Sequence, residues 1–262
     1  MTIHSRTAAA SFIFGMALVP SLVFAQGAAA PTTTAAPETR PALTAKLVQS
    51  KEKAIKEIDR RINALTDVTT RVQNMQKVTE AFKQNLSSAT QTQITGLTQL
   101  KSKVADATDA EVLKADIKSI TQSYRVYALF MPQAHISAAA DRVVLSTEMM
   151  TMLGTKLQGK ITALQGTGVD VGALTTAITE LAAKLSDART QAEAAVSTIA
   201  ALTPDGGDKT KMAANNTALK AARVNLQTAQ SDLVAARKNI QTIIAGLAKA
   251  NAVGAATSTP AR

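Results

Sequence analysis

The hydrophobic positions of this chain recur at steps of three and four residues along most of its length. Between residues 43 and 78 they form one stripe, which predicts an amphipathic helix about 54 Å long. A polar stretch follows, so we expect a turn somewhere between Thr79 and Ser88. A second stripe ends by Asp106 and predicts a second helix. The two stripes comprise Ile55, Ile58, Ile62, Leu65, Val68, Val72 and Met75, and then Ile94, Leu97, Leu100 and Val104.

The next two predicted helices flank Pro132. Thr108 and Glu111 fit a capping box, which marks the start of a helix. The stripe behind them comprises Ala110, Leu113, Ile117, Ile120, Tyr124, Tyr127 and Met131. After Pro132 the phase of the pattern fails, and a new stripe begins at Ile136. Because proline donates no amide hydrogen and clashes with the preceding turn, we predict a helix break or a sharp kink at Pro132.

Two further turns precede the last two predicted helices, one at Gly166–Asp170 and one at Leu202–Asp208. The first of these helices carries an unbroken stripe from Val171 to Leu202. The second repeats every seven residues, which predicts left-handed coiled-coil packing against its antiparallel neighbour. The repeating positions are Leu219, Leu226, Leu233, Ile240 and Leu247, and then Ala222, Ala229, Ala236, Ile243 and Ala250. The predicted fold class is all-α, an elongated antiparallel bundle of coiled-coil hairpins with about five to six long helices.

The N-terminus predicts export from the cytoplasm. A short positive region is followed by an apolar run from Ala8 to Phe24, and Val23 and Ala25 occupy the positions that a signal peptidase reads. We therefore expect a signal peptide over residues 1–25 and a secreted, periplasmic or cell-surface protein; an uncleaved anchor is the alternative. An Ala/Thr/Pro-rich flexible linker over 26–41, a helical-bundle domain over 42–250 and a disordered tail over 251–262 complete the predicted organisation. No span is expected in the mature chain.

The amino-acid composition limits the kinds of functional site that the chain can form. The chain has no cysteine, which excludes disulfides, thiolate metal sites and cysteine nucleophiles. Aromatic residues make up 3% and tryptophan is absent, so the core must be aliphatic. Removing residues 1–25 takes away Arg6 and no acid, which leaves 28 basic against 19 acidic residues, a net charge of +9. Such a charge favours anionic surroundings.

The basic residues gather most clearly on the first predicted helix. The candidates for binding an anionic surface are Lys51, Lys53, Lys56, Arg60 and Arg61. Three acids, Glu52, Glu57 and Asp59, are interleaved with them, and no aromatic residue is near. A nucleic-acid partner is therefore not expected, and a solvated helix face is the default interpretation of the cluster.

Around Pro132 we considered contact, catalytic and metal sites. Phe130 lies off the core phase that contains Tyr124 and Tyr127, so Phe130 and the neighbouring His135 are candidates for a surface or cross-layer contact. Ser137 and Asp141 would complete a hydrolytic triad by residue type with His135. However, residues two apart on one helix do not face each other.

Met149 and Met152, three residues apart, have a spacing that suits copper(I), but methionine is also a common filler of gaps in cores. We therefore predict no catalytic, cofactor or metal site.

Three segments, Ser119–Leu129 with Pro132 and then Ala138–Arg142, resemble a set of uncharacterised secreted helical proteins of bacteria. The resemblance covers most of residues 43–250, and Leu202-Thr203-Pro204 is a second shared marker. It implies a secreted all-helical bacterial protein and supplies no activity, ligand or catalytic residue.

These observations lead to two hypotheses about function. The first is a non-enzymatic structural or interaction protein of the cell envelope, which self-associates through helix faces. Apolar positions off the main stripes, such as Val144, Met149 and Ile244, would serve a partner helix or a third helix of the same chain. The alternative is a binding module for an anionic wall polymer or membrane surface. An enzyme that works through paired carboxylates ranks third.

Overall fold

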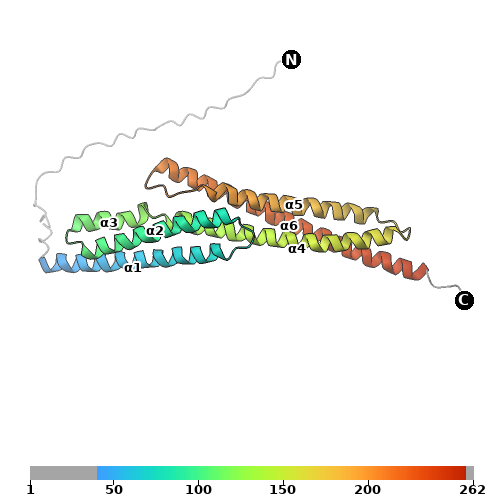
Figure 1. Ribbon diagram of the computed structural model, residues 1–262, viewed down its shortest axis with the longest axis horizontal. Coiled ribbons are helices and arrows are strands. Elements are labelled where there is room, and N and C mark those ends of the chain that lie inside the picture. The colour runs from blue at the N-terminus through green and yellow to red at the C-terminus, as the bar shows by residue number, and fades with distance from the viewer. Residues whose placement is uncertain (1–39, 258–262) are drawn as a thin grey trace, which may run out of the picture. The chain divides into compact units, whose positions relative to one another are not determined.

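The computed structural model of the chain describes residues 40–257, with side chains over residues 44–252. This range folds into helices joined by short turns and contains no strand, so the predicted all-α bundle is confirmed. The helices are α1 (Arg40–Gln73), α2 (Glu80–Asp106), α3 (Ala110–Gln122), α4 (Met131–Gln165), α5 (Gly172–Ala200) and α6 (Lys209–Thr257), with a π-helix η1 (Val126–Phe130) before α4 (Figure 1). The predicted signal peptide, and the predicted linker up to Thr39, lie outside the described residues.

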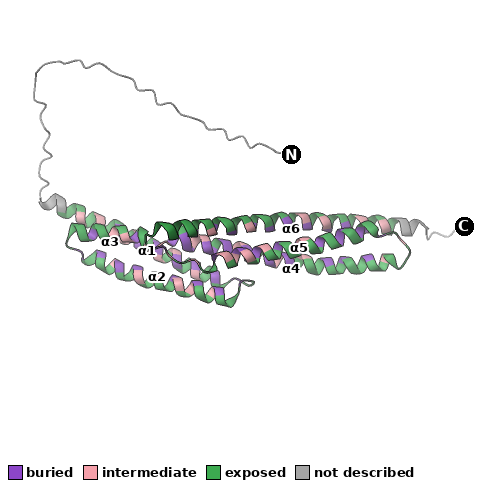
Figure 2. Ribbon diagram, turned by 90° about the horizontal axis from the view of Figure 1, so that it is seen from above, coloured by how far each residue is buried: buried purple, intermediate pink, exposed green. Residues whose placement is uncertain are grey.

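Helix α4 joins two groups of helices. On one side α1 packs against α2, and the short α3 contacts both of them. On the other side α5 and α6 share the most extensive contact of the described chain, and both also pack against α4 (Figure 1). The buried positions face inward between the helices and form one continuous hydrophobic core, which is aliphatic except for Phe82 and Phe130 (Figure 2). None of the described helices has a long enough apolar stretch to cross a membrane.

The contact between α5 and α6 follows the predicted pattern. All the predicted positions of α5 from Val171 to Ile199 are buried, as are those of α6 from Leu219 to Leu247. Alanines on both helices are fully buried, which brings the two backbones close together. Gly246 shows how close, because a Cβ built on it would lie 2.4 Å from Leu174 Cδ2. The turn between the helices contains Gly206 and Gly207, both with positive φ.

Four predicted boundaries need correction. The first turn spans residues 74–79 and so ends at Thr79, the first residue of the predicted window, whose hydroxyl caps α2. The polar stretch that suggested a later turn is helical; within it Thr90 is fully buried and its hydroxyl lies 2.8 Å from that of Thr69 on α1. Asp109, not Thr108, caps α3, because its carboxylate accepts from the Glu111 and Val112 amides. Finally, the helical part begins at Arg40 and α6 reaches Thr257, so the tail predicted to be disordered from residue 251 is helical over 251–257.

The break that we predicted at Pro132 lies upstream of it. The chain leaves the α-helical path after Gln122 and resumes as η1 at Val126, where bonds join residues five apart: the Met131 amide donates to the Val126 carbonyl. Pro132 then stands in the first turn of α4, where a missing amide hydrogen costs nothing. A π-helical turn holds more residues than an α-helical one, and this shift explains why the hydrophobic phase changes here.

Candidate functional site

The predicted basic cluster on α1 is largely committed to contacts within the chain. Arg60 and Arg61 both bond the Glu57 carboxylate, and their guanidinium carbons each lie 5.0 Å from the centre of the Tyr127 ring. The Lys51 ammonium donates to the Ala105 carbonyl at the end of α2, at 2.9 Å. Of the five residues, the exposed Lys53 and Lys56 alone make no polar contact within the described residues.

The side chains around Glu57 connect α1 to η1, and the Glu57 carboxylate neutralises part of the charge of the two arginines. Arg61 is only 7% exposed, and its guanidinium also donates to the Tyr124 carbonyl at 3.1 Å. Burial alone would raise the pKa of the Glu57 carboxyl, but hydrogen bonds and charge from Arg60 and Arg61 outweigh it and lower the pKa. Tyr127, predicted to pack in the core, is instead 38% exposed beneath these arginines. The two arginines therefore act as structural links between helices.

The two predicted contact residues beside Pro132 have opposite environments. Phe130 is 1% exposed and is among the largest fully buried side chains, so it offers no surface. The π-helical turn is the physical reason, because it moves Val126, Leu129 and Phe130 into the core. His135 is exposed, and its Nδ1 atom lies 3.3 Å from the Arg71 guanidinium of α1.

The residues of the hydrolytic-triad pattern do not come together. The buried Ser137 hydroxyl donates to the Gln133 carbonyl of its own helix. Asp141 is also buried and accepts from the Lys77 backbone amide in the turn between α1 and α2. His135 faces Arg71, so each of the three has a different partner.

The two methionines with copper(I) spacing lie on the surface of α4. No group of three or more His, Asp or Glu residues with metal-binding geometry occurs in the part of the chain that the structure describes. Met149 and Met152 are 61% and 62% exposed.

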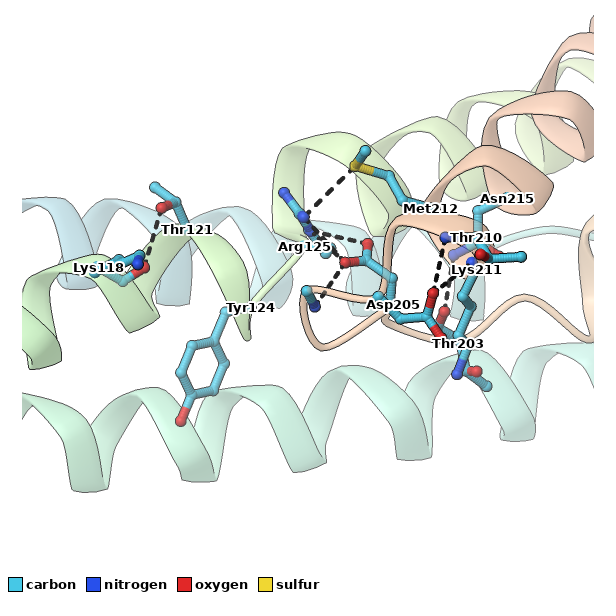
Figure 3. Close-up of polar contacts among 12 residues, drawn as sticks. Lys118, Thr121, Tyr124, Arg125, Thr203, Asp205, Thr210, Lys211, Met212 and Asn215 are labelled. Carbon is cyan, nitrogen blue, oxygen red and sulfur yellow. Dashed lines mark hydrogen bonds and ion pairs between the residues drawn. The ribbon is translucent and has the colours of Figure 1, made fainter.

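The segment after α3 is fastened to the turn between α5 and α6, which lies 80 residues further along the chain. The Arg125 guanidinium pairs with the Asp205 carboxylate at 2.9 Å and also reaches the Met212 sulfur (Figure 3). Asp205 further accepts from the Gly207 amide at 2.9 Å. The Asp205 side chain is only 4% exposed, so this ion pair is shielded from solvent on the acidic side.

Two amide side chains complete this connection, which we call the joint: Arg125, Gln133, Asp205 and Asn215. The Gln133 amide donates to the Ile199 carbonyl at the end of α5, at 2.9 Å. The Asn215 amide donates to the Thr203 carbonyl, also at 2.9 Å. The joint thus brings together the two sequence segments on which the resemblance rests, around residues 119–142 and 202–204. The sequence pattern did not predict the joint, because its four residues lie in turns or at isolated positions of helices and follow no periodic repeat.

Tyr124 occupies the other side of the same segment and leans over α2 (Figure 3). A Cβ built on Gly96 would lie 2.8 Å from the Tyr124 hydroxyl and 2.9 Å from a ring carbon. A glycine in the middle of a helix is destabilising by about 1 kcal/mol relative to alanine. Here the absent side chain makes room for the tyrosine ring. Burial raises the pKa of the Tyr124 hydroxyl.

A groove with a volume of about 870 Å³ lies between α4 and α5. Its floor is apolar and contains Gly154, Ile178, Leu181 and Leu185. Its wall on α4 carries threonines, and the exposed Met152 stands at its rim. Helix α6 packs against both α4 and α5 but contributes no residue to the groove. The groove therefore lies on a face that the other described helices leave open.

A second surface feature, which the sequence analysis missed, is the charge of α6. Seven basic residues lie along this helix against a single acid, Asp232, which pairs with Lys184 of α5. All seven are exposed, and none forms an ion pair within the described residues. They are Lys209, Lys211, Lys220, Arg223, Arg237, Lys238 and Lys249. Counting charges by helix would have found them, because α1 interleaves its basic residues with acids and α6 does not.

No protein-family model, curated protein or solved structure matches this chain.

Proposed function

We propose that this chain is a non-enzymatic structural protein of the cell envelope, which assembles with further copies of itself through the outer face of α4 and the groove beside it. The signal peptide that the sequence predicts over residues 1–25 supports the compartment. The observation that carries the proposal is the open α4–α5 groove, whose rim presents exposed apolar side chains. Exposed apolar surface beside a groove is typical of a protein interface.

The outer face of α4 is complementary to itself. Met152 is at its centre, with Glu148 one turn before and Lys156 one turn after it. When an antiparallel second copy places its Met152 against this one, each Glu148 comes opposite the Lys156 of the other copy. Such reciprocal pairing is what a two-fold symmetric interface requires. Lys156 is exposed and has no ion-pair partner within the described chain, whereas Glu148 also pairs with Lys77 at 2.7 Å.

Of the three apolar positions that we expected to contact a partner helix, one is buried in the core and two are exposed. Val144 is 5% exposed and belongs to the core of the chain itself. Met149 and Ile244 are 61% and 50% exposed and remain available at the surface. In this proposal Met149 lies within the interface beside Met152.

Met152→Glu is expected to weaken self-association at least tenfold, because two carboxylates would meet at the centre of the interface. Val234→Glu is the matched control, since Val234 is equally exposed at 65% but lies on α6. The dissociation constant is measured by sedimentation equilibrium for both variants. Equal association of the two variants would contradict the proposal.

Reversal of the flanking charges gives an independent check of the antiparallel register. Lys156→Glu alone places like charges opposite each other and should weaken association. The double variant Glu148→Lys with Lys156→Glu should restore it. A double variant weaker than the single one would exclude this register.

Binding to an anionic envelope polymer is a second candidate function, favoured by the seven unpaired basic residues of α6. The same property was predicted for the cluster on α1, but there Arg60, Arg61 and Lys51 are engaged within the chain. Exposed charges are screened over about 8 Å at physiological ionic strength, so such binding would weaken steeply with salt.

The variants Lys220→Gln with Lys238→Gln, on α6, and Lys53→Gln with Lys56→Gln, on α1, remove the same charge from the two surfaces. If α6 is the binding surface, the α6 pair should reduce cosedimentation with phosphatidylglycerol vesicles at low salt, and the α1 pair should change it less. Equal losses would show that only the net charge matters. No cosedimentation of the unaltered chain would reject this function.

A further inference from the structure

One buried carboxylate forms no ion pair within the described residues. The buried charged side chains of the described residues are Arg61, Asp141, Asp205 and Asp232. Arg61, Asp205 and Asp232 each form an ion pair with a side chain of opposite charge. Asp141 forms none within the part of the chain that the structure describes, although it is only 7% exposed. A carboxylate removed from water without a cation loses hydration that nothing of opposite charge replaces.

Among the described residues, Asp141 accepts one hydrogen bond, and its donor is a neutral backbone amide. Its Oδ1 atom accepts from the Lys77 backbone amide at 2.5 Å. Lys77 also lines the pocket described below, and its ammonium pairs with Glu148 at 2.7 Å. The next residue, Arg142, is exposed, and its guanidinium donates to the Ala138 carbonyl of its own helix. The neighbouring cations are therefore engaged with other groups.

Asp141 lines a pocket of about 330 Å³ where the turn between α1 and α2 meets α4 and α5. Most of its wall is apolar and includes Phe82, Val144 and Val196. A second acid, Glu193, also lines the pocket but is bonded to Arg189 at 2.8 Å. A concave apolar space with a few polar groups, at the small end of the volume range of ligand sites, has the form of a small-molecule site.

We propose that this pocket binds a small organic cation, an ammonium group on a short apolar body. The ammonium would pair with the Asp141 carboxylate, and the body would lie against the apolar wall. A ligand of this class would supply the ion-pair partner that Asp141 lacks among the described residues. The site is separate from the outer face of α4 and from the basic face of α6, so it stands independently of both functions proposed above.

The probes for the test are benzylammonium, its neutral counterpart benzyl alcohol, and the anion phenylacetate, each titrated into the chain by NMR. Benzylammonium should bind saturably, and benzyl alcohol at least tenfold more weakly, because it lacks the charge that Asp141 requires. Phenylacetate should not bind. Equal affinity for benzylammonium and benzyl alcohol, or no saturable binding of benzylammonium, would overturn the proposal.

Asp141→Asn is the matching variant, since the asparagine oxygen can still accept from the Lys77 amide while the charge is lost. It should lower the affinity for benzylammonium roughly tenfold and reduce the difference between the charged and neutral probes. Asp109→Asn is the control, because it removes an exposed acid outside the pocket. Thermal unfolding shows whether each variant is folded; if Asp141→Asn is not, the comparison of the three probes on the unaltered chain decides. Unchanged binding by a folded Asp141→Asn variant would contradict the proposal.

Discussion

Replacing Phe130 by alanine is expected to lower the free energy of unfolding by about 3–5 kcal/mol, the cost of removing a buried aromatic side chain. Phe130 is 1% exposed and belongs to the π-helical turn that leads into α4. Its removal would leave a cavity where η1 packs between α1 and α4. Urea unfolding followed by circular dichroism measures the loss.

Two further variants test whether the loss of stability in Phe130→Ala comes from the burial of the side chain. Phe130→Leu keeps most of the apolar volume and should cost clearly less than alanine. Met149→Ala removes a side chain that is 61% exposed, so the free energy of unfolding should change by about 0.5 kcal/mol or less. A Phe130→Ala variant as stable as Met149→Ala would mean that Phe130 lies at the surface, as the helical pattern of the sequence had suggested.

Arg125→Ala is expected to destabilise the chain by about 3 kcal/mol, because it leaves the carboxylate of Asp205 buried without its cation. The Asp205 side chain is 4% exposed and that of Arg125 is 21% exposed. Arg189→Ala is the matched control, since its ion pair with Glu193 is more than half exposed on both sides and should contribute less than about 1 kcal/mol. Similar losses in the two variants would show that the joint does not fasten the two parts of the chain.

The same ion pair predicts how stability changes with acid. Burial would raise the pKa of Asp205, but bonds and charge from Arg125 and the Gly207 amide outweigh it and lower the pKa. A carboxyl whose pKa is lower in the folded chain stabilises it above the pKa of the unfolded chain, and this contribution is lost as pH falls through the folded pKa. Arg125→Ala should therefore lose less stability on acidification than the unaltered chain. An equal loss would place the acid sensitivity elsewhere.

The sequence predicted best where one regular helix packs along another. In α5 and α6 every step of the pattern is three or four residues, and each step places a side chain in the same contact, so the buried positions could be read directly. The turns there were equally clear, because Gly168, Gly206 and Gly207 adopt positive φ values that glycine tolerates.

The three-and-four pattern gave the wrong burial around Phe130, because it assumes a constant number of residues per helical turn. The π-helical turn shifts the phase, which buried Phe130 and exposed Tyr127. Pro132 correctly marked a disturbance, but a proline is also favourable at the start of a helix, so the break could fall before it.

The joint could not be predicted from the sequence, for a different reason. Arg125 and Asp205 are 80 residues apart, and a single ion pair between two turns leaves no periodic trace. The basic cluster on α1 was visible, but its partners Tyr127 and the Ala105 carbonyl come from other elements. Only the packing of the helices shows that these cations are engaged.

Light scattering on residues 26–262, at low and at high salt, tests the central claim most directly. The account predicts a dimer or larger assembly that persists in high salt, because apolar side chains on the outer face of α4 form the centre of the contact. A monomer under both conditions, at concentrations up to about 100 µM where weak protein interfaces become occupied, would contradict assembly through α4.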